Sequence, residues 1–139
     1  MDGGRGVSGR GPTLQDAFAQ VGLGVLALAV DPASVEERET RAVRAHGVDP
    51  VDLLVNWLNE CLYVLDVEGF VACRVEFITF VPHGAALGGE PLRLHSLLHG
   101  EEAEPHRHDS RPLLGTFSPK DASIIEGQDG VEARAVTHG

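Results

Sequence analysis

The sequence predicts an α+β fold in which two helices cover one face of a largely antiparallel sheet. Two stretches, 14–29 and 50–65, repeat apolar residues every three or four positions, as amphipathic helices do. Segments rich in β-branched and aromatic residues lie between and after them. No internal repeat, glycine-rich phosphate loop or low-complexity tract interrupts this order, which is typical of helices packed on a sheet.

The first helix is predicted at residues 14–29, with Thr13 as its N-cap. Gly22 and Gly24 fall inside it, and each costs a helix about 0.5–1 kcal/mol relative to alanine. Close packing of this helix against a sheet would explain both glycines. The Asp-Pro pair at 31–32 ends the helix.

The second helix begins at Pro50, with Asp49 as N-cap, and carries a continuous apolar stripe from Leu53 to Leu65. The alternating segments predict strands at 37–46, 70–81, 92–98 and 131–137.

Two segments lack the apolar side chains that would hold them in place. Residues 1–12 are rich in glycine, which predicts a disordered N-terminal segment. Residues 109–130 are mostly polar and predict a mobile excursion from a single domain that spans 13–139.

Composition narrows the classes of function. The 139 residues hold 21 acidic and 11 basic side chains, a formal net charge of -10. Nucleic-acid-binding proteins normally present a basic face, and no window of this sequence gathers more than a few Lys or Arg. We therefore expect no direct nucleic-acid binding; an acidic chain suits metal ions or basic protein surfaces.

The two cysteines and the apolar segments indicate a cytoplasmic protein. Cys61 and Cys73 lie in apolar stretches, where a free cysteine behaves as a small core residue. The N-terminus has no apolar region typical of a signal peptide. The longest apolar stretch, 21–30, is about half of what a membrane span requires.

Three stretches in fixed order resemble the archease family. They are GPTLQDAFAQVGLGVLALAVDP at 11–32, GVDPVDLLVNWLNECLYVLDVEG at 47–69 and VEARAVTHG at 131–139. The middle stretch is similar to the family helix "LLVxWLNELLY". The pairs at 100–101 and 107–108 are similar to a short polar family segment, "GE…RH".

The resemblance implies a function and a site. Archeases are non-enzymatic, chaperone-like activators of an RtcB-type tRNA-splicing RNA ligase, which they help to bind guanosine nucleotide and metal over repeated turnovers. A "DHTAD" motif on the first strand and an Asp near the C-terminus hold a divalent cation such as calcium, which prefers oxygen ligands. Arg134 stands where the family has the Lys of "KAxT" and is the candidate ligase contact.

The sequence has no counterpart of the "DHTAD" motif or of the terminal Asp, so the fold is expected to lack the first and last family strands. Two explanations remain open: ends that are truncated or misassigned, which we favour, or a degenerate member that has lost activation. Asp31 is the remaining weak candidate for a metal ligand.

The alternative from another class is a small His/carboxylate metal-binding protein or a metallohydrolase. His106, His108 and Asp109 would be the ligands and Glu101 the base, since transition metals favour imidazole with carboxylate. The competing interpretation of this segment is a solvated polar loop.

Overall fold

The computed structural model describes residues 5–82, 91–110 and 115–138. Its elements, in chain order, are β1 (Arg5–Gly11), α1 (Leu14–Ala29), the short 3₁₀ helix η1 (Pro32–Ser34), β2 (Glu39–Gly47), α2 (Pro50–Asp66), β3 (Phe70–Val81), β4 (Leu92–Glu102), β5 (Thr116–Gly127) and β6 (Gly130–His138).

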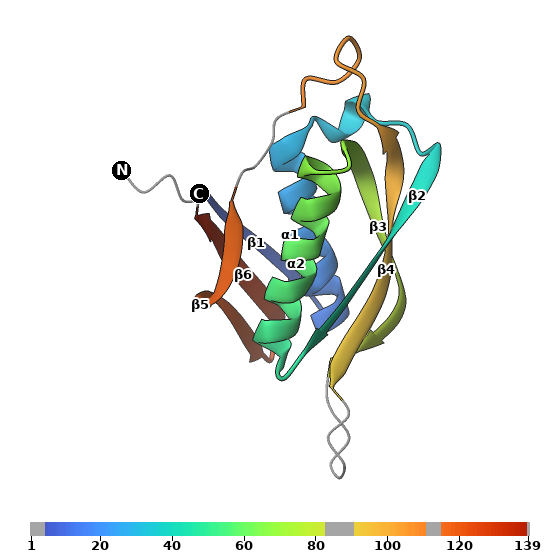
Figure 1. The fold of residues 1–139 in the computed structure, drawn as a ribbon. Coiled ribbons are helices and arrows are strands. Elements are labelled where there is room, and N and C mark those ends of the chain that lie inside the picture. Colours follow the sequence, from blue (N-terminus) through green and yellow to red (C-terminus); the bar gives the residue numbers. More distant parts are fainter. Residues whose placement is uncertain (1–4, 83–90, 111–114, 139) are drawn as a thin grey trace.

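The strands form two three-stranded antiparallel sheets, with orders β1-β6-β5 and β2-β4-β3. The helices lie between these sheets (Figure 1). The predicted α+β class and antiparallel pairing are therefore confirmed, whereas the expected single sheet is corrected to two. The reason is that α1 packs against β1 and β6 of one sheet and against β3 of the other, so its apolar side chains are covered from two sides.

Strand β1 corrects the prediction of disorder for residues 1–12. Residues 5–11 pair with β6 along their whole length, from Arg5 opposite Thr137 to Gly11 opposite Val131. The glycines serve close packing here: a Cβ on Gly9 would lie 2.5 Å from the Cβ of Gln20 in α1. Residues 1–4 lie outside the described residues.

The expectation that the first and last family strands are absent is also wrong. β1 and β6 are both present and are hydrogen-bonded neighbours in one sheet. The glycine-rich composition of the first segment concealed a strand whose backbone, rather than its side chains, provides the pairing.

Strand β5 corrects the mobile excursion predicted at 109–130. Residues 116–127 pair with β6, with an irregularity between Phe117 and Ala122. Asn59 of α2 holds the start of this strand, because its amide group donates to the Phe117 carbonyl (3.1 Å) and accepts from the Phe117 N–H (2.8 Å). Residues 111–114 lie outside the described part of the chain.

Both helix starts are as predicted. The Thr13 hydroxyl accepts a hydrogen bond from the Asp16 N–H (3.2 Å), and the Asp49 carboxylate accepts one from the Asp52 N–H (2.8 Å). These bonds satisfy backbone donors that a helix leaves without partners in its first turn.

The core centres on Trp57, which is fully buried in α2. Its indole N–H donates to the Ser96 hydroxyl (2.9 Å), which donates to the Val43 carbonyl (2.9 Å), so the ring is tied to the β2-β4-β3 sheet. A Cβ on Gly22 would lie 2.5 Å from this ring. Gly22 therefore allows α1 to approach α2 rather than a sheet, whereas Gly24 faces Val7 of β1.

Candidate functional site

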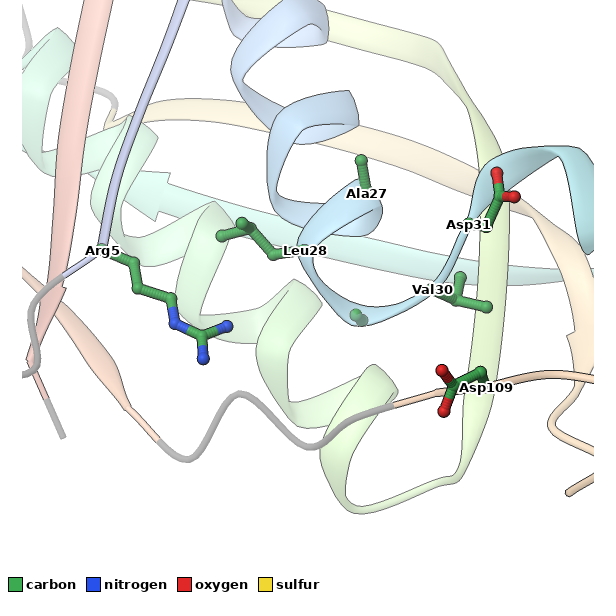
Figure 2. A pocket seen from close by; sticks show the side chains of 7 residues that line it. Arg5, Ala27, Leu28, Val30, Asp31 and Asp109 are labelled. Atoms are coloured by element: carbon green, nitrogen blue, oxygen red, sulfur yellow. The ribbon is translucent and has the colours of Figure 1, made fainter.

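A pocket of about 500 Å³ lies between β1, the end of α1 and the segment that follows β4. The lining residues are Arg5, Ala27, Leu28, Ala29, Val30, Asp31 and Asp109. Figure 2 shows the three charged side chains around an apolar wall, each coming from a different segment of the chain. The structure thus brings together two predicted candidates, Asp31 and Asp109, which are far apart in the sequence.

Asp31 is fixed by the turn that follows α1. One carboxylate oxygen accepts a hydrogen bond from the Ala33 N–H (3.0 Å), and the Asp31 carbonyl accepts from the Ser34 hydroxyl (2.7 Å). Asp31 is the N-cap of η1, so its position follows from local backbone structure. The residue is exposed, which leaves its carboxylate accessible from the pocket.

Asp109 is positioned by a polar network just before it in the chain. The Glu101 side chain, which is only 3% exposed, receives two parallel bonds of 2.9 Å from the Arg107 guanidinium. It also accepts from the Glu36 N–H (2.7 Å) and contacts the His108 ring (3.1 Å). We call the side chains of Glu101, Arg107 and His108, together with the Glu36 N–H, the clamp. The clamp holds residues 103–108 against the end of β4 and leaves Asp109 at the pocket rim.

The electrostatics of the clamp keep Glu101 ionised. The paired Arg107 guanidinium, with help from the Glu36 N–H, lowers the pKa of Glu101 from 4.5 to about 2. The same pairing raises the pKa of Arg107. A carboxylate held in this way cannot take up protons near neutral pH, so Glu101 is not suited to the role of a general base.

The clamp also separates the histidines of the metallohydrolase hypothesis. His108 is buried, with Nδ1 accepting from the Glu104 N–H (2.9 Å), while the His106 side chain is 79% exposed and points to Glu104 (3.6 Å). Over residues 5–82, 91–110 and 115–138, no group of three or more His, Cys, Asp or Glu side chains is placed to hold a metal ion. The structure therefore does not assemble His106, His108 and Asp109 into a ligand set.

The pocket itself does not fit a divalent cation on its described residues alone. Asp31 and Asp109 offer only two carboxylates, and the Arg5 guanidinium lies in the same pocket. Calcium takes about six to eight oxygen ligands. These two carboxylates are therefore too few to form a calcium site by themselves.

Arg134 lies away from this pocket, on β6. Its side chain is 63% exposed, and it pairs with Glu132 at 3.4 Å. Arg134 lies opposite Ser8 of β1 and Ser123 of β5, so it is on the central strand of its sheet.

Sequence reasoning missed Arg5, because it falls in a segment predicted to be disordered. Val7, the one apolar side chain larger than glycine in residues 5–11, was the only signal of a strand there. None of the helices in the described residues is long and apolar enough to cross a membrane.

Comparison with known proteins connects this geometry to a family. A sequence model of the archease protein family matches residues 5–137. The protein archease of Thermococcus gammatolerans is 44% identical over 126 residues, which cover 90% of this chain and 84% of that protein. The archease-like protein of Drosophila melanogaster is 26% identical over 113 residues, covering 78% and 72%.

Two solved structures share the fold. The solution structure of protein 1598 of Methanobacterium thermoautotrophicum has a TM-score of 0.65 and 20% identity, covering 98% of this chain and 91% of that one. The crystal structure of a Thermotoga maritima protein described as an archease and possible chaperone has a TM-score of 0.55 and 9% identity, covering 98% and 89%.

Proposed function

Since this chain belongs to the archease family, we propose that it is a non-enzymatic activator of an RtcB-type RNA ligase in tRNA splicing or RNA repair. In this role it promotes guanylylation of the ligase and its repeated turnover. The observation that carries the proposal is the family match over residues 5–137, which includes both strands expected to be missing. The activity belongs in the cytoplasm, where the free thiols Cys61 and Cys73 stay reduced.

The state of the reactive side chains supports a role without catalysis. The side chains of Glu101 and His108 both make hydrogen bonds within the clamp. Burial raises the pKa of the Cys61 thiol, which keeps it protonated and unreactive. These residues hold the fold together, and so the ligase is left to perform the chemistry.

We propose that the ligase contacts the pocket rim and the outer face of β6. Asp31 and Asp109 are exposed carboxylates on a chain of net charge -10, which suits a basic partner surface. Arg134 adds an exposed guanidinium on β6, the central strand of the β1-β6-β5 sheet. A divalent cation held at this pocket would need oxygen ligands beyond Asp31 and Asp109.

The test is multiple-turnover RNA ligation by the cognate ligase at limiting guanosine nucleotide and divalent metal. Added chain should raise turnover, and Asp31→Asn, Asp109→Asn and Arg134→Ala should each reduce the stimulation. Asp129→Asn, in the exposed turn between β5 and β6, is the matched control for loss of one negative charge. Ligation that is unchanged by the wild-type chain would overturn the proposal.

A further inference from the structure

The outer face of the β2-β4-β3 sheet carries four basic side chains that come together only on folding. Arg44 and His46 of β2 lie opposite His95 and Arg93 of β4, respectively. We call these four residues the basic cluster. With Thr79 of β3 and Leu94, they line a cavity of about 210 Å³.

The alternation of the strands places the basic cluster on the face away from the helices. Val43 and Ala45 on β2, and Leu94 and Ser96 on β4, are buried toward the core. Neighbouring residues therefore point outward. Side chains two apart on a strand are about 7 Å apart, and directly opposed ones about 5 Å, so the four groups can reach a single small ligand.

Three of the four side chains of the basic cluster differ from those at the opposite end of the same face, where Arg74 and His99 are paired. There Arg74 bonds Glu37 (2.9 Å), and His99 contacts Glu76 (2.8 Å). In the basic cluster, by contrast, the side chains of Arg44, His46 and His95 have no hydrogen-bond or ion-pair partner within the described residues. Uncompensated donors gathered around a cavity are suited to an anion.

We propose that the basic cluster binds phosphate groups. Guanidinium groups match phosphate geometry, and imidazole N–H groups add donors. The cavity is smaller than the roughly 300 Å³ at which pockets for drug-sized ligands begin, so it accommodates a phosphate group rather than an enclosed nucleotide. Among the described residues, its lining contains no aromatic ring beyond the two histidines, which argues against base stacking and against a protein hot spot.

The ligand is therefore the phosphate of a nucleic-acid strand or a free phosphate, bound without reading a base. The expectation of no nucleic-acid binding came from counting Lys and Arg in contiguous stretches of sequence. Such a count misses the basic cluster, because β2 and β4 are distant in the sequence and become neighbours only in the sheet. Because the whole chain is acidic, binding is weak and decreases as salt increases.

The test is a titration of the ¹⁵N-labelled full chain, followed by amide and imidazole NMR shifts at constant ionic strength. One arm uses inorganic phosphate and the other a 5′-phosphorylated oligouridylate octamer. Shifts should saturate and centre on the basic cluster. Arg44→Gln should weaken binding by about tenfold, the factor expected for one charged hydrogen bond.

Arg74→Gln is the matched control, because it removes one positive charge from the same sheet face at a paired site. It should leave the affinity unchanged, and His46→Ala provides a second test if Arg44→Gln disturbs the spectrum. Tighter binding of the octamer identifies a nucleic-acid strand as the ligand, whereas equal affinity per phosphate group identifies free phosphate as the ligand. Equal weakening by Arg44→Gln and Arg74→Gln, shifts elsewhere, or equally strong binding of polyglutamate would overturn the proposal.

Discussion

Replacing Gly22 by alanine should destabilise the protein, although alanine is the better helix former. The added Cβ would lie 2.5 Å from Cη2 and 3.1 Å from Cζ3 of Trp57. Carbon atoms pack at about 3.5–4.0 Å, so the ring or the helix must move by about 1 Å. The ring has little freedom, because its N–H bonds Ser96 and it lies against Phe18 and Phe77.

Two opposing effects set the magnitude. Alanine gains about 1 kcal/mol over glycine inside a helix. Overpacking a filled core costs about 1–3 kcal/mol, and a ring held on several sides places Gly22→Ala near the upper end. We expect a net loss of about 2 kcal/mol in the free energy of unfolding.

Gly24 is the matched control, two residues later in the same helix. A Cβ there would lie 3.6 Å from Val7, which is ordinary contact. Gly24→Ala should therefore keep the propensity gain and stabilise the protein by about 0.5–1 kcal/mol.

Urea unfolding followed by circular dichroism and by fluorescence of the single tryptophan measures both variants. The urea concentration at the unfolding midpoint should be highest for Gly24→Ala, intermediate for the wild type and lowest for Gly22→Ala. The slope of the unfolding free energy against urea should not change. A Gly22→Ala midpoint at or above that of the wild type would refute the proposed contact between α1 and the Trp57 ring.

Three further predictions follow from other contacts. The lowered pKa of Glu101 contributes stability that is complete above pH 4.5 and is lost as pH falls toward 2. The wild-type Tm should therefore fall more steeply across this pH range than the Tm of Glu101→Gln. Parallel curves of Tm against pH would contradict this prediction. Asn59→Ala removes both bonds to the Phe117 backbone and should cost about 1–3 kcal/mol in urea unfolding, whereas no change would show that β5 is held by other contacts. Burial raises the thiol pKa of both Cys61 and Cys73, but Cys73 is only half-buried. Cys73 should therefore react before Cys61 with a thiol reagent at pH 8. Labelling of both thiols at the same rate would indicate that the whole fold opens before either reacts.

The helices were predictable because their signals are local. Thr13 and Asp49 each cap a helix within three residues, and an apolar stripe repeats along the chain, so neither start depends on distant contacts. The strands at 70–81 and 131–137 were predictable for the same reason, since β-branched and aromatic residues gather within the first segment and alternation is visible within the second.

β1 and β5 were not predictable in this way, since their stability comes from pairing with β6. Gly9 permits the close approach of α1, and a glycine-rich segment has the composition of a disordered one. Neither the Asp31–Asp109 pocket nor the basic cluster corresponds to a motif, because each joins residues that only the fold brings together. The polar "GE…RH" segment was recognised, but its role as a clamp depends on the reach of Arg107 to Glu101.

The pairing of β1 with β6 has a consequence for synthesis on the ribosome. Of the described strands, β1 is synthesised first and its partner β6 is synthesised last. The Thr137 hydroxyl of β6 donates to the Arg5 carbonyl of β1, 132 positions away in the sequence. At about 5–20 residues per second, β1 waits roughly 7–26 s for that partner. During this interval the β2-β4-β3 sheet and both helices can assemble, while the side of the helices that β1, β5 and β6 later cover stays open to solvent and to chaperones.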